Sequence, residues 1–337
     1  MVVSETTPSE KHIPPNVSFV VIGYNEATSL KACLGSIQGA EMPAGVSSEL
    51  IYVDGGSKDD SIGIAEGCAV DLVLGGERRR KAAENRNLGL AAARGRYVQF
   101  IDSDMTLASD WPKAAMTFLD HHAEAAAVCG NLHEVGTGAF ARALEIDWGP
   151  REGPIRHCGG AAMYRRETLV KLGGFPENVE YGEEPYLCWR VRNELQQTIH
   201  QLGRKMADHA LGYRRFMDYW RRNLRMGATY AEIAARCCHS PERLWLKETA
   251  GNVAWMAAAL ICLAALIAGP VWLKLAAVLF AGGIVLRKCI QAGRRGYALP
   301  VAAAYAVHTY AAKVPLGLGT CLWLVRRHCL GAKRRSS

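Results

Sequence analysis

The sequence predicts an α/β fold with a mostly parallel sheet, followed by an α-helical membrane region. Between residues 17 and 206, strand-like apolar segments alternate with helical segments about every fifteen to twenty-five residues, which is typical of parallel strands joined by crossover helices. From residue 249 to residue 286 the chain is rich in Ala, Leu, Val and Gly, and Lys274 is its only charged residue. Such a stretch is typical of membrane-spanning helices.

Composition and charge narrow the class of protein. The chain has 337 residues, a net charge of +8 and 11 cysteines. Its basic runs flank apolar segments, which favours an anionic membrane surface over nucleic acid as partner. No two cysteines form a C-x-x-C pair, so we expect the soluble part to be reduced and cytoplasmic. Residues 1–16 are polar and lack an apolar h-region, which predicts a disordered tail rather than a signal peptide.

The elements of the α/β domain, expected at residues 17–213, follow from local patterns. Strands are expected where β-branched, aromatic and aliphatic residues run together, and helices where apolar residues recur every three or four positions. The predicted strands are residues 17–22, 48–53, 70–74, 97–101, 126–130 and 158–164. The predicted helices are residues 27–38, 62–68, 81–94, 111–121 and 167–172, with another starting at Glu183. Residues 136–151 show a less regular pattern.

Residues 214–248 predict amphipathic helices at the membrane interface. Phe216, Trp220, Leu224 and Ala228 recur every four positions, and arginines fill the other faces. A basic amphipathic helix of this kind commonly lies on a protein or membrane surface, and the apolar segments that follow favour the membrane.

Residues 249–330 are predicted to form the membrane region, with spans at about 250–268 and 271–286 separated by Gly269-Pro270. The basic residues around the pair place both of its ends in the cytoplasm, as in a multi-pass inner-membrane protein. Residues 297–325 contain ionisable residues, Pro and Gly, so interfacial or re-entrant helices are favoured over a third span. Residues 331–337 are a basic tail. The alternative is a buried hairpin in a soluble protein, which apolar residues all round both segments disfavour.

Two acidic motifs are candidates for chemistry. The strand at 97–101 leads directly into Asp102-Ser103-Asp104, and ligands of open α/β sheets bind outside the carboxyl ends of the strands. Two carboxylates there suit a hard divalent cation, which can in turn hold a diphosphate. The second motif is Glu183-Glu184 at the head of a helix, with Pro185 in the first turn, where proline is tolerated.

Five motifs in a fixed order resemble those of glycosyltransferase family 2, whose members are inverting nucleotide-sugar transferases with the GT-A fold. The motifs are VSFVVIGYNE at 17–26, VDGGSKD at 53–59, ENRNLG at 84–89 with RGRY at 94–97, FIDSD at 100–104, and GEE at 182–184. The resemblance covers roughly residues 17–206. It implies a nucleotide-sugar donor, with a UDP-sugar favoured, and Mg²⁺ or Mn²⁺ as cofactor.

The resemblance also implies a role for individual residues. The donor site would contain Ile22, Tyr24, Glu26, Asp54, Arg86, Asp102 and Ser103. Tyr24 would face the base, Asp54 would accept a hydrogen bond from uracil, and Arg86 would lie near the ribose and phosphates. Asp104, with Asp102, would hold the metal, and Glu184 would be the general base, with Glu183 as the alternative. As simpler readings, Asp54 would form a turn beside glycines, and Glu184 would suit the helix dipole.

The sequence departs from the family pattern in two places. The acidic motif of the base is commonly Glu-Asp-x-Asp, whereas here it reads Glu183-Glu184-Pro185-Tyr186. Processive members carry Gln-x-x-Arg-Trp, which Tyr219-Trp220-Arg221-Arg222 matches only loosely. We therefore expect one sugar per encounter, transferred to a lipid or lipid-linked glycan at the cytoplasmic face, in polysaccharide biosynthesis. The alternatives are a sugar nucleotidyltransferase, disfavoured by Gly23-Tyr24-Asn25-Glu26 after the first strand, and a catalytically degenerate membrane scaffold.

Overall fold

The computed structural model describes residues 14–135, 138–148, 151–179, 181–209 and 216–335, so most of the predicted tail lies outside the described residues. Within them, nine strands form one sheet in the order β3-β2-β1-β4-β8-β6-β9-β5, with β7 paired to β9. The strands are β1 (Val17–Gly23), β2 (Ser48–Asp54), β3 (Leu72–Leu74), β4 (Tyr97–Asp102), β5 (Met105–Leu107), β6 (Ala125–Glu134), β7 (Gly153–Pro154), β8 (Ala162–Arg165) and β9 (Thr198–His209).

The first half of the sheet is parallel, as predicted. Strand β1 pairs in parallel with β2 and β4, and β2 with β3. The register places Gly23 opposite Asp54 and Ile22 opposite Asp102. The carboxyl ends of β1, β2 and β4 therefore meet at one edge of the sheet, where a ligand of an open α/β sheet binds.

The second half is mixed, so the sheet is less parallel than expected. Strand β8 is antiparallel to both β4 and β6, while β6 and β9 are parallel. Strands β5 and β7 are short and pair antiparallel with β9. Neither they nor β9 were expected, because β9 reads TIHQLGRKMADH, a polar sequence with one glycine that lacks the apolar run of a buried strand.

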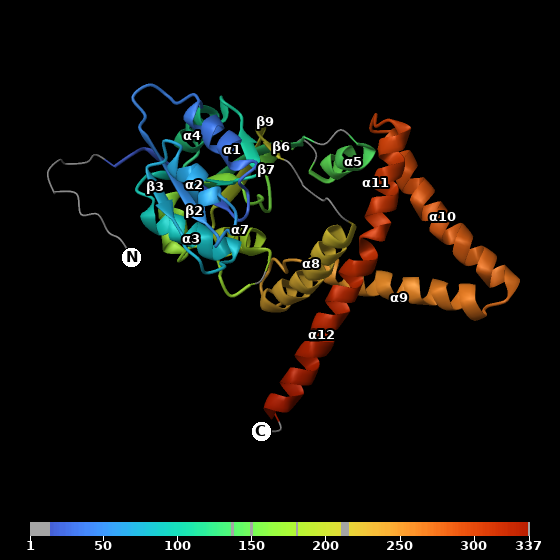
Figure 1. Ribbon diagram of the computed structural model, residues 1–337. Helices are drawn as coiled ribbons and strands as arrows, with labels where there is room; N and C mark the ends of the chain where they lie inside the picture. The colour runs from blue at the N-terminus through green and yellow to red at the C-terminus, as the bar shows by residue number, and fades with distance from the viewer. Residues whose placement is uncertain (1–13, 136–137, 149–150, 180, 210–215, 336–337) are drawn as a thin grey trace.

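Helices cover the sheet and carry part of the site. They are α1 (Leu30–Gln38), α2 (Ser61–Glu66), α3 (Ala82–Ala92), α4 (Trp111–His121), α5 (Ala139–Trp148), α6 (Arg166–Lys171) and α7 (Glu183–Glu194). Helix α5 lies in the segment predicted to be less regular. It packs against the C-terminal helix α11 (Leu299–Ala311) (Figure 1). Its side chains find their apolar partners in a distant part of the chain, which a local pattern does not reveal.

The core of the α/β domain lies on both faces of the sheet. All seven residues of β1 are buried. Phe100 on β4 makes edge-on contacts with Tyr164 and Phe175, with ring centroids 6.1 and 5.0 Å away. Trp111 is fully buried and donates its indole N–H to the Oε1 of Gln99 at 2.9 Å, so the buried amide of the central strand has a partner.

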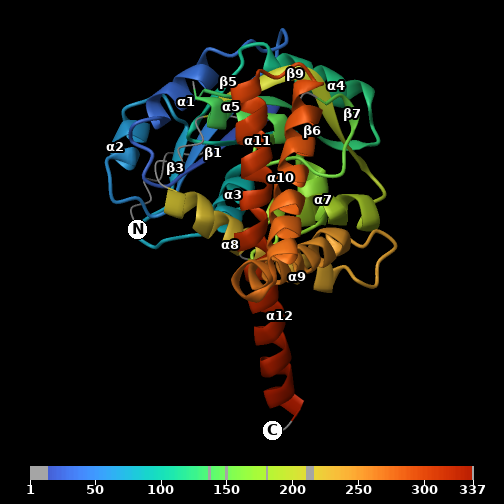
Figure 2. The same cartoon turned by 90° about the vertical axis from the view of Figure 1, so that its right-hand side faces the viewer.

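The C-terminal region is helical and extends away from the sheet (Figure 1). After α8 (Phe216–Arg236), the chain forms α9 (Leu246–Ala268), α10 (Val271–Gly293), α11 and α12 (Lys313–Arg335). Helices α10 and α11 run side by side, and the end of α12 projects beyond the rest (Figure 2). The predicted apolar segment 297–325 is thus two helices that meet at Ala312, and α12 continues into the predicted basic tail.

One described helix, α9, is long and apolar enough to cross a membrane. Helix α10 carries Lys274, Arg287 and Lys288, so the predicted pair of spans is not confirmed. Large apolar side chains are nonetheless exposed along both helices: Ile261 on α9 is 69% exposed, and Leu279 on α10 is 74% exposed.

Helix α8 connects the two regions through close backbone contacts. A Cβ on Gly227 of α8 would overlap the carbonyl oxygen of Leu316 on α12, and a Cβ on Gly319 would overlap that of Leu224. On its other side α8 meets the start of α7, because a Cβ on Gly182 would lie 2.9 Å from Thr229. The C-terminal helices therefore pack, through α8, against the helix that begins with Glu183 and Glu184.

Candidate active site

The Asp102-Ser103-Asp104 motif lies at the carboxyl end of β4, as predicted. Ser103 is buried and donates its backbone N–H to the carbonyl of Ile22 at 3.0 Å, which continues the β1–β4 pairing into the turn. The side chains of Asp102 and Asp104 are 32% and 31% exposed. Both carboxylates are thus held by a rigid strand end and remain accessible to a ligand.

Arg86 brings three of the predicted carboxylates together. This arginine of α3 is 2% exposed. Its Nη2 lies 2.9 Å from the Oδ1 of Asp102, and its Nη1 lies 2.9 Å from an Oε1 of both Glu183 and Glu184. Arg86 therefore joins the strand-end motif to the head of α7. Both of its Nη atoms are thus paired with carboxylates of this acidic cluster.

Glu184 is the member of the acidic pair whose environment suits proton transfer. Burial, and then the charge of Glu183, raise the pKa of Glu184 to about 7, while Arg86 opposes the shift. The Glu183 side chain is 10% exposed and that of Glu184 is 16% exposed. A carboxyl group with a pKa near neutrality can exchange a proton at physiological pH.

Gly160 allows the backbone to approach this cluster. A Cβ at that position would lie 2.8 Å from the Oδ2 of Asp102 and 3.2 Å from the Oε1 of Glu184, and would overlap Arg86. The loop before β8 therefore packs directly against the acidic cluster, which explains the glycine at position 160.

Asp104 has a neighbour, His209, that sequence reasoning missed. Its Oδ2 lies 3.5 Å from the Nε2 of His209, at the end of β9, and the Nδ1 of His209 contacts Glu134 at 2.7 Å. Burial disfavours the charged imidazolium, but Asp104 and Glu134 outweigh it and raise the pKa of His209 to about 9. No local signal in the sequence connects His209 to Asp104, because β9 itself was not predictable.

The residues around Asp104 fit a divalent cation in part. The Oδ1 of Asp104 is buried without a hydrogen-bond partner, and a buried orphan carboxylate oxygen is costly unless a ligand satisfies it. Within the described part of the chain, no three His, Cys, Asp or Glu side chains form a preformed metal cluster. A cation at Asp104 therefore needs further oxygen ligands from a bound molecule, such as a diphosphate.

A basic loop covers the part of the candidate donor site that is predicted to bind the nucleobase. The guanidinium of Arg79 lies 3.5 Å from the ring centroid of Tyr24, which is a cation–π contact. Asp54 is fully buried: its Oδ2 accepts the N–H groups of Gly56 and Ser57 at 2.8 and 2.7 Å, and its Oδ1 lies 3.2 Å from the hydroxyl of Tyr52. Asp54 thus forms the turn that its glycine neighbours indicate.

Ile22 and Glu26 frame the same turn. Ile22 is buried at the end of β1, and the Oε2 of Glu26 accepts the hydroxyl proton of Ser29 at 2.8 Å. The structure therefore brings Arg86, Asp102, Glu183 and Glu184 into one cluster, and it places Tyr24 and Asp54 beside each other under the loop of Arg79. Arg79 stands in a basic run at 78–81, which is the only signal that could have singled it out.

Comparison with known proteins identifies the family that the α/β domain resembles. Residues 18–173 match the family Glycosyl transferase family 2. The chain is 30% identical over 196 residues to a pre-mycofactocin glycosyltransferase of Mycobacterium tuberculosis, which covers 52% of this chain and 39% of the relative. It is 28% identical over 178 residues to a PGL/p-HBAD biosynthesis glycosyltransferase of Mycobacterium bovis, covering 50% of this chain and 65% of the relative. The chain thus spans less than two thirds of these relatives.

Solved structures support the fold over most of the chain. A mannosyltransferase from Pyrobaculum calidifontis, in complex with GDP-Man and Mn²⁺, superposes with a TM-score of 0.63 at 21% identity, covering 90% of this chain and 88% of the other. S. aureus TarS 1-349 with UDP-GlcNAc gives a TM-score of 0.51 at 16% identity, covering 87% and 90%. Residues 18–173 thus resemble glycosyltransferase family 2, and the chain has a GT-A-like fold.

Proposed function

We propose that the protein is a membrane-associated inverting glycosyltransferase. It moves one sugar at a time from a nucleotide-sugar donor, for which we favour a UDP-sugar, to a lipid or lipid-linked glycan at the cytoplasmic face of the membrane. The observation that carries this proposal is the cluster in which Arg86 holds Asp102 beside Glu183 and Glu184. It supports the proposal because it holds a pair of glutamates next to the strand-end edge at which ligands of open α/β sheets bind.

In this proposal Glu184 is the general base. Inversion requires a carboxylate that takes the proton of the acceptor hydroxyl while that oxygen attacks the anomeric carbon. Glu184 is the more accessible member of the pair, and its pKa of about 7 gives it affinity for the proton without keeping it protonated above neutral pH. Arg86 orients the carboxylate, and the backbone at Gly160 limits the space beside it.

The donor occupies the strand-end side of the cluster. Asp104, with Asp102 next to it and His209 at 3.5 Å, would hold Mg²⁺ or Mn²⁺. Such an ion neutralises the charge that develops on the departing nucleoside diphosphate. Tyr24 would stack its ring on the nucleobase of the donor. Arg79, which now lies on that ring, must either move aside or cover the other face of the nucleobase.

The exposed apolar side chains of α9 and α10 support a membrane location. Side chains such as Ile261 and Leu279 are as exposed as surface residues, yet they are among the most hydrophobic of the chain. Exposed apolar patches of this extent mark membrane or protein contacts. With α9 in the bilayer and α8 packed against α7, a lipid-linked acceptor could reach Glu184 from the membrane side.

The deciding experiment is a donor survey on the purified full-length chain. Hydrolysis and transfer are measured with UDP-, GDP- and TDP-sugars in the presence of Mn²⁺, in detergent with a lipid extract as acceptor. We expect turnover of one nucleotide class and its loss in excess chelator. Asp104→Asn should weaken donor binding. If no sugar nucleotide is turned over, the proposal is wrong; full activity in chelator contradicts the metal role alone.

A further inference from the structure

A basic cavity lies beside the loop that leads into the active site. It has a volume of about 500 Å³ and is lined by Arg151, Glu152, Pro154, Ile155, Arg156, His157 and Gln201. Two of these residues are arginines and one is an acid. The cavity follows β7, on the outer edge of β9, and is separate from the strand ends that carry Asp102 and Asp104.

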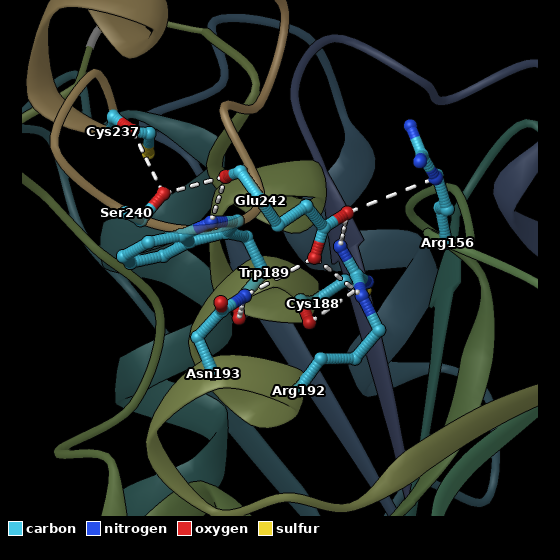
Figure 3. A network of polar contacts seen from close by, with 8 residues as sticks. All are labelled: Arg156, Cys188, Trp189, Arg192, Asn193, Cys237, Ser240 and Glu242. Carbon is cyan, nitrogen blue, oxygen red and sulfur yellow. Dashed lines mark hydrogen bonds and ion pairs between the residues drawn. The ribbon is translucent and has the colours of Figure 1, made fainter.

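The positive charge of this cavity is poorly neutralised. The side chain of Arg156 is 77% exposed, and its one ion contact among the described residues is 3.8 Å to Glu242. Glu242 is already engaged, because its two carboxylate oxygens lie 2.8 and 3.1 Å from the guanidinium of Arg192 (Figure 3). The side chain of Arg151 makes no ion pair with any described residue. The charge of Arg156 is therefore available to a ligand.

The arginines around the cavity also affect His157. His157 is an exposed residue whose ring lies edge-on to Trp245, with centroids 6.4 Å apart. Burial and the charges of Arg192, Arg151 and Arg156 lower the pKa of His157. At neutral pH the ring is uncharged, so it adds a hydrogen-bonding group and no net charge to the cavity.

The cavity is connected to the active site by two short paths. His157 precedes Gly160 by three residues, and Gly160 borders Glu184 and Asp102. Arg192 and Glu184 are on the same helix, eight residues or roughly 12 Å apart. A group held in the cavity would thus be connected to Glu184 both through Glu242 and Arg192 and through the loop at Gly160.

We propose that this cavity binds a phosphate group of the acceptor. The proposal rests on the proposed glycosyltransferase function and deepens it, since it makes the acceptor a phosphorylated lipid or a phosphorylated glycan. Arginine is the residue best suited to such a group, because its planar guanidinium donates two parallel hydrogen bonds to phosphate oxygens. Holding the phosphate near Arg192, roughly 12 Å along α7 from Glu184, would position the acceptor hydroxyl at the base.

The test is a calorimetric titration of the full-length chain in detergent with inorganic pyrophosphate, in buffer that contains EDTA and no donor. The Arg151→Gln/Arg156→Gln double variant should bind pyrophosphate at least tenfold more weakly than the unmodified chain. Arg204→Gln is the matched control, because Arg204 is 61% exposed and pairs with Asp110 away from the cavity; it should bind within twofold. Glu152→Gln removes the opposing charge and should tighten binding.

The outcomes separate this proposal from the proposed function. Binding that is absent, or unchanged in the double variant, overturns the cavity even if sugar transfer is intact. Arginine-dependent binding supports it even if no sugar is transferred, because the titration contains neither donor nor metal. A short-chain phosphatidic acid then identifies the source: arginine-dependent binding indicates a lipid headgroup, whereas binding of pyrophosphate alone indicates a soluble phosphorylated acceptor.

Discussion

The α/β domain and the helices α9 and α10 use apolar residues in opposite ways. In the domain, aromatic and β-branched side chains such as Tyr97 and Val98 are buried between the sheet and its helices. In α9 and α10, side chains of similar hydrophobicity point away from the rest of the chain. The domain is therefore stabilised by its own core, whereas the two helices have apolar surface that requires a partner outside the chain. The comparison predicts that chemistry and membrane binding respond to different substitutions.

The largest expected effect is on chemistry alone. Glu184→Gln keeps the size of the side chain but cannot accept the proton, so transfer should fall by about 10²- to 10⁴-fold, while donor binding and membrane association persist. Glu184→Asp should keep partial activity. Initial rates with the identified donor measure the effect, and Glu194→Gln at the other end of α7, where Glu194 pairs with Arg190 at the surface, is the control. Loss in Glu183→Gln with full activity in Glu184→Gln would transfer the role to Glu183.

The second prediction concerns membrane association alone. Ile261→Arg places a charge in the middle of α9, which costs about 3 kcal/mol of insertion free energy, or roughly a hundredfold in partitioning. Val170→Arg is the matched control, since Val170 is an exposed apolar residue of α6 in the α/β domain. In a liposome flotation assay, the Ile261→Arg variant should no longer float with the liposomes, whereas the Val170→Arg control should. Equal flotation of both would mean that α9 does not enter the bilayer.

The same contrast explains what the sequence could predict. The parallel strands, the helix at Trp111–His121 and the position of Asp102 and Asp104 followed from local patterns, because each element there repeats its burial pattern over several residues. In the mixed half, strands β6 and β8 were also predicted, but the antiparallel pairing of β8 and the strands β5, β7 and β9 were not. Strand β9 has a mixed polar sequence that is stabilised by pairing with β6 on one side and with β5 and β7 on the other.

In the candidate site, too, the individual residues could be predicted from the sequence, but the contacts between them could not. Motifs and the resemblance identified the acidic residues one by one, but the salt bridges from Arg86 to three of them arise from residues 16 to 98 positions apart in the chain. The contact of Asp104 with His209 depends on β9, and the basic cavity depends on β7. Contacts of this kind are set by tertiary pairing, so a single sequence without relatives does not contain a local signal for them.

The third prediction is a pH dependence confined to the α/β domain. Glu184 acts as a base only when it is unprotonated, and its pKa is raised to about 7. The value of kcat/KM at saturating metal should therefore be about tenfold lower at pH 6 than at pH 8, with an acidic limb near pH 7. Flotation with uncharged liposomes should not change over this range. A flat rate profile between pH 6 and pH 8 would contradict the base assignment.

The smallest expected effect tests how the two regions are joined. Gly227→Ala adds a Cβ that overlaps the Leu316 carbonyl, so α8 and α12 must separate, at a cost of about 1–3 kcal/mol. Gly251→Ala on α9 is the matched control, because nothing lies within 4 Å of its added Cβ. Both changes gain the helix propensity of alanine, about 1 kcal/mol, so the difference in thermal midpoint between them isolates the contact.

The Gly227 variant should unfold at a lower temperature and, since α8 packs on Gly182 at the head of α7, should also transfer sugar more slowly. Equal midpoints would mean that the α8–α12 contact contributes nothing to stability. A lower midpoint with unchanged transfer would mean that the helices anchor the domain without positioning Glu184.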